Sequence, residues 1–141
     1  MKKIQIFLAA IVAVVMTSCV NFKTEATVDV KVLDPDGKEV GAGIVVYKFT
    51  DNGLGEGTTL YKDNASGSAK TNSGSLAHFD LKSPDDFTPS DIAGVDVREQ
   101  NTFFFCTYDA EGTRNGFIAV TVKTGDNKTV TLKMEKPQQD E

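Results

Sequence analysis

The side chains that most often do chemistry in proteins are scarce in this sequence. It contains two cysteines, Cys19 and Cys106, and a single histidine, His78. A zinc site of the Cys/His kind needs four ligands, and imidazole-based acid-base chemistry has only one residue to use here. The sequence therefore predicts a protein that is not an enzyme and that holds no metal and no cofactor.

Cys19 is the one residue for which the sequence predicts a covalent modification. It follows the small residue Ser18 at the end of an apolar run, residues 6–15, and two lysines stand near the start of the chain. Ten apolar residues are too few to cross about 30 Å of hydrocarbon, which takes roughly 20 residues. The run is therefore typical of an export signal.

This segment resembles a bacterial lipoprotein signal, with Met16 where that family prefers Leu. The resemblance implies that residues 1–18 are removed and that Cys19 becomes the acylated N-terminus. Several acyl chains hold a small domain on a bilayer, because each buried CH₂ contributes roughly 0.8 kcal/mol. We expect a protein of the cell envelope, anchored at the outer membrane through Cys19, with either the cell surface or the periplasmic face as its location.

The charge of the chain excludes another class of function. Fifteen Lys and Arg residues stand against 20 Asp and Glu residues, a formal net charge of −5, and loss of Lys2 and Lys3 with the signal makes the chain more acidic. Such a domain is repelled by nucleic acid and by anionic lipid surfaces. We therefore expect no nucleic-acid partner, and contact with the membrane through the anchor alone.

Cys106 is predicted to be a small buried hydrophobe rather than a nucleophile. It lies in the apolar run of residues 102–108, and acylation of Cys19 leaves it without a disulfide partner. A reactive thiolate needs a base or a cation nearby. The nearest cations in the sequence are Arg98 and Arg114, each eight positions away. We therefore expect no catalytic or redox role for this thiol.

Three acidic clusters could bind Ca²⁺ or pair two carboxylates, and each is better explained by turn chemistry. None has the spacing of a known calcium loop, and adjacent carboxylates in a loop are not a positioned acid and base. His78 stands beside Asp80 without a second donor nearby in the sequence and is predicted to lie on the surface. We predict no metal site, with calcium in a loop as the alternative. The clusters are Asp34, Asp36 and Glu39; Asp51, Asn52 and Glu56; and Asp85 with Asp86.

The elements that must position these residues are β-strands, because the hydrophobic period is two from residue 27 onward. Val28, Val30 and Val32 alternate with polar residues, whereas residues 42–49 are apolar on both faces. The last two strands are predicted to form a hairpin. The predicted strands cover residues 27–32, 42–49, 76–81 and 103–108, a stretch in which Ile118, Val120 and Val122 face inward, and residues 129–134.

Two irregular stretches separate these strands. Residues 51–75 are rich in Gly, Ser, Thr and Asn and are predicted to be a long connection, with room for a short strand at residues 58–62. Residues 82–100 contain two prolines and leave room for one or two helical turns at 90–93 or a short strand at 95–98.

No stretch outside the signal shows helical periodicity, so we predict an all-β fold. It is a single Ig-like or prealbumin-like sandwich of about seven antiparallel strands with two long loops. The expected divisions of the chain are a signal peptide at residues 1–18, a tether at 19–26, the sandwich domain at 27–134 and a polar tail at 135–141.

A family resemblance rests on short motifs spread over residues 27–134. They are Val28-x-Val30-x-Val32, Asp36-Gly37-Lys38, Gly41-Ala42-x-Ile44-x-Val46-Tyr47, Thr71-x-x-Gly74-x-x-x-x-Phe79-x-Leu81, Thr107-Tyr108-x-Ala110-x-Gly112 and Thr129-Val130-Thr131-Leu132. In this order they resemble the prealbumin-like or carboxypeptidase-regulatory-like β-sandwich. Together with the signal segment, they make the chain similar to small envelope lipoproteins of Bacteroides-like bacteria. The resemblance implies an accessory, adhesive or binding module.

Two related activities can be tested on single residues. Transthyretin-like hydrolases use several His and Arg residues and end in Tyr-Arg-Gly-Ser, whereas this chain has only His78 and continues as Glu135-Lys136-Pro137 after its last strand. Pilin-type sandwiches link a Lys of the first strand to an Asn or Asp of the last. Lys31 is present here, but residues 129–134 contain neither. We therefore expect neither the hydrolase activity nor the covalent link.

One hint of an interaction surface comes from the aromatic run of residues 103–105. Alternation sends Phe104 to the face opposite Phe103 and Phe105, so a loop or a partner must cover one side. The candidate surface residues are Tyr61, Phe104 and Tyr108.

These observations predict a non-enzymatic, lipid-anchored envelope protein that binds an envelope protein or a glycan through its long loops. The alternative is a structural subunit of an envelope assembly, such as a secretion apparatus or a fimbria, which joins its neighbours through an exposed strand edge.

Overall fold

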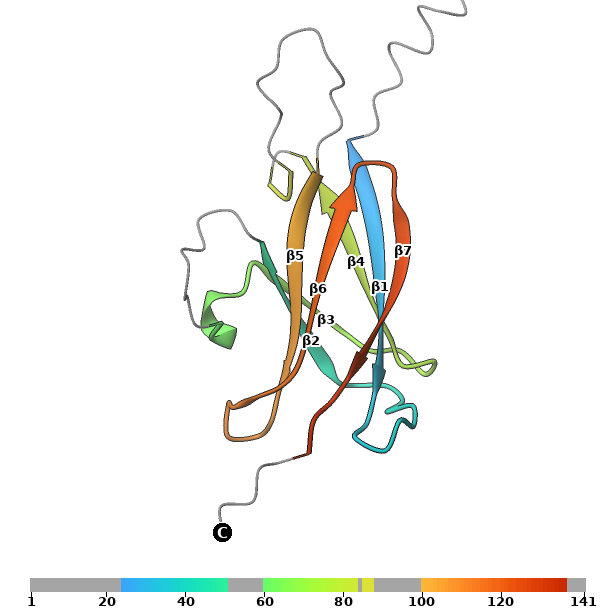
Figure 1. The fold of residues 1–141 in the computed structure, drawn as a ribbon, viewed down its shortest axis with the longest axis vertical. Helices are drawn as coiled ribbons and strands as arrows, with labels where there is room; N and C mark the ends of the chain where they lie inside the picture. Colours follow the sequence, from blue (N-terminus) through green and yellow to red (C-terminus); the bar gives the residue numbers. More distant parts are fainter. Residues whose placement is uncertain (1–23, 51–59, 84, 88–99, 137–141) are drawn as a thin grey trace, which may run out of the picture.

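Seven strands and one short 3₁₀ turn make up the computed structural model, which describes residues 24–50, 60–83, 85–87 and 100–136 (Figure 1). The chain is therefore all-β, as the two-residue period predicts. The elements are β1 (Glu25–Leu33), β2 (Val45–Thr50), η1 (Lys62–Asn64), β3 (Gly67–Lys70), β4 (Leu76–Lys82), β5 (Gln100–Tyr108), β6 (Arg114–Lys123) and β7 (Asn127–Lys133).

The strands form two sheets that pack face to face, as Figure 1 shows. One sheet has the order β4-β1-β7 and the other the order β3-β2-β5-β6. All pairs are antiparallel except β1 and β7, which run parallel with Val30 opposite Val130. The prediction of a wholly antiparallel sandwich is wrong at this pair. Alternation reveals which face of a strand is buried, but it carries no signal for the direction of the neighbouring strand.

The core lies between the two sheets and is built by alternate residues of each strand. Val28, Val30 and Val32 of β1 are fully buried, and each contributes about 1.5–3 kcal/mol relative to an exposed side chain. They belong to one buried cluster with inward-facing residues of the opposite sheet, among them Phe103 and Phe105. The predicted inward face of β1 is thus confirmed, and the structure shows that Phe103 and Phe105 form the inward face of β5.

The predicted hairpin at the end of the chain is wrong. β6 and β7 are consecutive, but β6 pairs with β5 in one sheet and β7 pairs with β1 in the other. The connection of residues 124–126 crosses between the layers. Gly125, at a φ of 92°, permits the sharp change of direction.

Three strand boundaries differ from the prediction. β1 starts at Glu25 and buries Ala26, so the predicted tether of residues 19–26 overlaps the sheet by two residues. β2 starts at Val45 rather than at residue 42, because Gly43 takes a φ of 101° that a strand does not use. The short strand predicted at residues 58–62 is wrong over its described part, since Lys62 begins η1.

A strand is found instead at Gly67–Lys70, in a sequence of low β-propensity. This strand, β3, is held by its pairing with β2. Several predictions lie outside the described residues: the acylated Cys19, the helical turns at 90–93 and the strand at 95–98. Within the part of the chain that is described, no helix has the length and apolar character that a membrane span requires.

Candidate interaction surface

The outer side of the four-stranded sheet carries a second set of apolar side chains. Phe103 and Phe105 of β5 point into the core, so the residues between and after them point outward. Because directly opposed residues share a face, the register gathers aromatic residues from β2 and β6 beside them. We call this set the outer aromatic face. It comprises Tyr47 and Phe49 of β2, Phe104, Cys106 and Tyr108 of β5, and Phe117 of β6.

The rings of this face contact one another in pairs. Phe104 stacks on Phe117 with centroids 5.8 Å apart and planes 19° from parallel. Tyr47 meets Tyr108 edge to face at 5.3 Å. The guanidinium carbon of Arg114 lies 5.1 Å from the centre of the Phe117 ring. Each aromatic pair contributes about 0.5–1.5 kcal/mol beyond its buried area, so the face is an ordered surface.

The outer aromatic face is most exposed at its β6 edge. Phe49 on β2 is 2% exposed and Cys106 on β5 is fully buried, whereas Phe117 on β6 is 47% exposed. Among the described residues, Phe117 and Tyr61 are the exposed large apolar side chains. Phe117 therefore places an open apolar ring at the edge strand of this sheet.

The structure places the three predicted surface residues on or beside this face. Phe104 and Tyr108 lie on it, and the Tyr108 hydroxyl donates a 2.7 Å hydrogen bond to the carbonyl of Leu60, the residue before Tyr61. Burial raises the pKa of Tyr108 to about 12. The hydroxyl is therefore a permanent donor at neutral pH, and it holds the chain at residues 60–61 beside the sheet.

Phe117 and Arg114 are surface residues that the sequence prediction missed. The available signal was the inward alternation of Ile118, Val120 and Val122, which sends Phe117 outward. The pairing of β5 with β6 then brings Phe117 next to Phe104. That register could not be read from either strand alone.

Cys106 is a buried free thiol on this face. Burial raises its pKa, and the nearby Arg114 opposes the shift without cancelling it. Cys106 and Arg114 are eight residues apart in the sequence but close in space. Arg114 pairs with Tyr108, which is two residues after Cys106 on the same face of β5. A cation is present, yet burial keeps the thiol protonated.

His78 has two carboxylate partners, contrary to its prediction as an isolated surface residue. Its Nδ1 lies 2.7 Å from Oδ1 of Asp29, which is opposite it on β1, and its Nε2 lies 3.1 Å from Oδ1 of Asp80. The hydrogen bond with Asp29 and then that with Asp80 raise the pKa of His78. The side chain is 54% exposed, as expected for a surface residue.

The first acidic cluster is occupied by turn contacts. Oδ1 of Asp34 accepts backbone N–H bonds from Asp36 and Lys38, both at 2.9 Å, which is the pattern of an Asx turn. Glu39 pairs with Lys31 at 2.6 Å. The register places Thr131 opposite Lys31 on β7, so no Asn or Asp faces this lysine across the strand pair.

The second acidic cluster is not described by the structure, and the two members of the third have different environments. Asp51, Asn52 and Glu56 lie outside the described residues. Asp85 is exposed, but its neighbour Asp86 is 7% exposed and pairs with Lys48 of β2, so the prediction of a solvated turn is wrong for Asp86. In the described part of the chain, no three His, Cys, Asp or Glu side chains are grouped as metal ligands.

No protein-family pattern and no curated protein matches this sequence. Among solved structures, the chain is similar to a minor pilin of the gram-positive pathogen Streptococcus agalactiae, with 15% identity and a TM-score of 0.47. The match covers 84% of this chain and 48% of the pilin, so the chain spans about half of that protein's length. A likeness of this degree does not identify a function for this chain.

Proposed function

We propose that this protein is a non-enzymatic interaction module of the bacterial cell envelope, anchored by acylated Cys19 and binding an envelope protein or a glycan through the outer aromatic face. The observation that carries the proposal is the stack of Phe104 on Phe117, because Phe117 is 47% exposed. Binding sites for proteins are enriched in aromatic residues and Arg, and Arg114 lies against this ring.

The anchor supports this proposal through its position in the chain. Five residues separate Cys19 from Glu25, the first residue of β1. At 3.6 Å or less per residue, this link spans at most about 20 Å. The end of the sandwich where β1 starts and β6 ends, at the top of Figure 1, would therefore face the membrane. The outer aromatic face then runs away from the bilayer, and its exposed part around Phe117 stays accessible.

Fatty-acid labelling of cells tests the anchor. The wild-type protein should incorporate an alkyne-bearing fatty acid and sediment with membranes, and Cys19→Ala should do neither. Cys106→Ala is the matched control, because the thiol of Cys106 is buried and its loss should leave labelling unchanged. Membrane-bound, labelled Cys19→Ala protein would contradict the anchor.

Photocrosslinking in native envelopes tests the binding surface. A photoreactive phenylalanine at position 117 should give discrete adducts with a partner, identified by mass spectrometry. The matched position is Thr131, which is also exposed but lies on the other sheet. Identical adducts from both positions would show that the outer aromatic face is not selective and would overturn this part of the proposal.

A structural subunit of an envelope assembly is the second candidate function, and the edge of the four-stranded sheet at β6 favours it. Edge strands present unpaired backbone groups that can continue a sheet into a neighbour. Crosslinking of intact envelopes separates the two candidates. An assembly subunit gives a ladder of regularly increasing masses, whereas a binding module gives one complex of defined mass.

A further inference from the structure

We propose that the edge of β6 binds an extended, acidic segment of a partner protein, which adds to the four-stranded sheet as a new strand. This inference rests on the proposed function and deepens it, because it names the class of partner and the site. It is carried by three observations on β6: a row of open backbone groups, an exposed aromatic ring beside them, and basic side chains at both ends.

The odd-numbered residues of β6 direct their backbone groups away from β5. At the far end of the strand, both backbone groups of Lys123 bond to Asp126. The Lys123 N–H donates to the carboxylate of Asp126, and the Lys123 carbonyl accepts the backbone N–H of Asp126, both at 3.0 Å. At the near end, the carbonyl of Asn115 accepts the N–H of Glu135 at 2.7 Å. Backbone groups alternate in direction along a strand, so the odd residues between these two also face outward.

Those residues are Phe117, Ala119 and Thr121. In the described part of the chain, the N–H groups of all three and the carbonyls of the first two have no partner outside the β5–β6 ladder. The carbonyl of Thr121 accepts a 2.7 Å hydrogen bond from Nζ of Lys128. Donors and acceptors repeat along this edge at strand spacing, and an extended backbone is the ligand that complements such a row.

The side chains beside this row set β6 apart from the other sheet edges. β3 has only four residues. The edge of β4 is lined by the polar side chains of His78, Asp80 and Lys82, and that of β7 by Thr129, Thr131 and Lys133. Charged and polar side chains of this kind protect an edge from pairing. β6 instead presents Phe117, 47% exposed, beside its open groups, so an added strand would also cover apolar surface.

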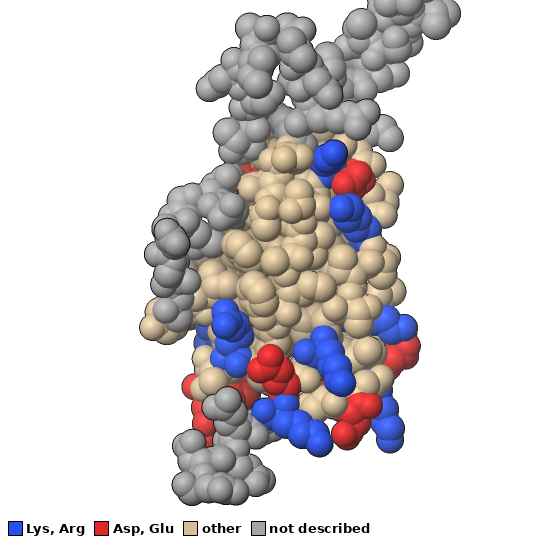
Figure 2. Space-filling model, viewed as in Figure 1, with Lys and Arg blue, Asp and Glu red and all other residues tan. Residues whose placement is uncertain are grey.

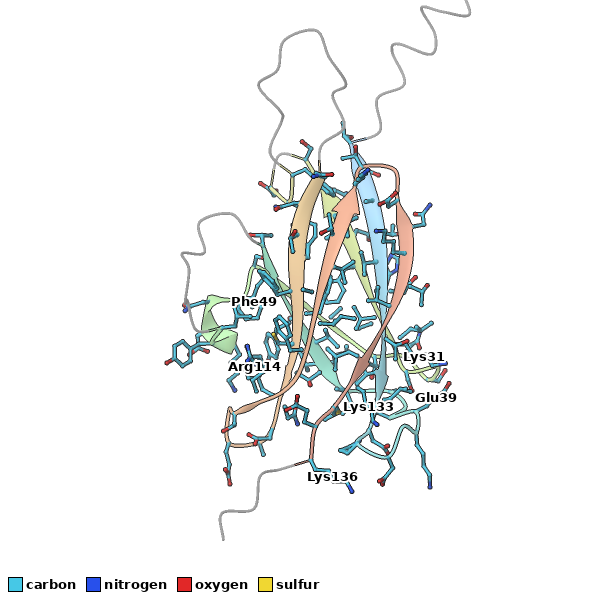
Figure 3. The ribbon with its side chains drawn as sticks, in the orientation of Figure 1. Lys31, Glu39, Phe49, Arg114, Lys133 and Lys136 are labelled. Carbon is cyan, nitrogen blue, oxygen red and sulfur yellow. The ribbon has the colours of Figure 1, made fainter. Side chains whose placement is uncertain are left out.

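The charges around the edge select the partner. β6 carries Arg114 and Lys123 and no acidic residue, in a chain whose net charge is −5. Lys128 reaches across from β7. Figure 2 shows an uncharged surface over the middle of this side of the molecule, with Lys and Arg side chains above and below it and Asp and Glu side chains among them. Figure 3 places Arg114, Lys133 and Lys136 toward the lower end. An extended segment with acidic flanks matches this pattern.

A second copy of this chain matches the edge less well. Two β6 strands paired antiparallel around Ala119 would bring Arg114 of one copy close to Lys123 of the other, at both ends of the interface. Like charges opposed across strands are destabilising. The partner is therefore a different protein, and self-association is an outcome that the experiment can detect.

Amide hydrogen exchange measured by NMR tests the proposal. The probe is a capped nine-residue peptide with a central Val-Thr-Val-Thr-Val run and Asp-Glu flanks, added to the mature chain carrying Cys19→Ser. The free protein should exchange the amide protons of Phe117, Ala119 and Thr121 rapidly, and the peptide should slow all three at least tenfold in a saturable way. The same peptide with Lys-Arg flanks should bind at least tenfold more weakly.

Two variants localise the effect. Ala119→Pro removes an outward N–H without touching the β5–β6 ladder, a position that tolerates proline, and should abolish the protection. Thr131→Pro is the matched control, because the residues on either side of Thr131 bond β1 and its own N–H faces outward from β7. A peptide with N-methyl groups on alternate residues, which cannot bond an edge, should give no protection and needs no protein variant.

The outcomes are distinct. Protection at His78 or Thr131 instead of at β6, equal binding of both peptides, or no protection at any edge overturns the proposal. Protection of Phe117 that grows with protein concentration in the absence of peptide shows that a second copy is the occupant and also overturns it. The hydrogen-exchange test uses the Cys19→Ser protein, so it does not depend on whether Cys19 is acylated. A negative result in it would overturn strand addition at β6, and the photocrosslinking test of the proposed function could still be positive.

Discussion

The ammonium group of Lys48 lies 2.5 Å from a carboxylate oxygen of Asp86, and the two side chains are only 10% and 9% exposed. The second oxygen of Asp86 accepts the backbone N–H of Lys82 at 2.9 Å. Phe87, the next residue, is fully buried and meets Phe103 edge to face at 5.7 Å. This ion pair therefore holds the chain that follows β4 against the opposite sheet.

Removal of one partner of this pair should be strongly destabilising. Asp86→Ala leaves the Lys48 ammonium buried without a counter-charge, and the free energy of unfolding should fall by about 3–5 kcal/mol. The double variant Lys48→Met/Asp86→Asn should lose less, because no uncompensated charge remains. Urea denaturation measures the free energy of unfolding of the wild-type protein and of each variant. Asp85→Ala, at the exposed neighbouring position, should change stability by less than about 0.5 kcal/mol; a similar loss in both single variants would contradict the role of the pair.

Gly116 should not tolerate even a methyl group. A Cβ at this position would collide with Oγ1 of Thr107 and lie 2.6 Å from Cδ2 of Leu132, which packs there from the opposite sheet. Gly116→Ala should lower the free energy of unfolding by about 1–3 kcal/mol through overpacking. Gly67→Ala is the matched strand variant, because its Cβ would meet the nearest atom at an ordinary 3.5 Å. If thermal denaturation shows equal losses for the two, the two sheets are not closely packed at Gly116.

The pH dependence of stability should include a contribution from His78. Its pKa is raised from 6.5 by Asp29 and then Asp80, so the folded state binds the proton more tightly than the unfolded state. This contribution is fully present below about pH 6.5 and is lost as the pH rises through the raised folded-state pKa.

NMR titration of the His78 ring checks this directly. The pKa in the folded protein should exceed 6.5, and Asp29→Asn should lower it more than Asp80→Asn. His78→Gln should remove the corresponding loss of melting temperature that accompanies a rise in pH above about 6.5. A titration at or below 6.5 in the wild-type protein would show that the two hydrogen bonds do not persist in solution.

The thiol of Cys106 should be inert in the folded protein. It is fully buried, and burial raises its pKa, so little thiolate is present and reagents cannot reach it. In a Cys19→Ala background, a thiol-reactive reagent should modify Cys106 at least about a hundredfold faster in denaturing urea than in buffer. An accessible reference is Thr121→Cys in a chain lacking both native cysteines, which should react at the same rate in either condition. Rapid labelling of native Cys106 would show that the outer aromatic face opens.

The buried faces of the strands could be predicted from the sequence because alternation is a local property. Val28, Val30 and Val32 bury one side of β1 wherever that strand lies, and Phe103 and Phe105 do so for β5. By contrast, Gly67–Lys70 has no apolar alternation of its own, and it becomes a strand because β2 offers a partner. The parallel direction of β7 likewise depends on which strand lies beside it.

The candidate surface could be predicted only in part. The outward direction of Phe104 follows from its two inward neighbours. Its stacking with Phe117, the approach of Arg114 and the buried contact of Lys48 with Asp86 each join residues from different strands or loops. No spacing along the chain encodes such contacts, because they depend on strand register and on which sheet each strand joins.

The sequence by itself determined that the chain is an all-β domain, which residues of its strands are buried, and how few groups are available for catalysis. These properties depend on residue type and on a period of two, so neighbours along the chain carry the information. Only the tertiary structure decided that Cys106 lies near a cation but stays protonated, that His78 has two carboxylate partners, and that β6 is an open edge beside Phe117. Each of these arises when strands that are distant in sequence are brought within a few ångströms by sheet pairing and by the packing of one sheet on the other.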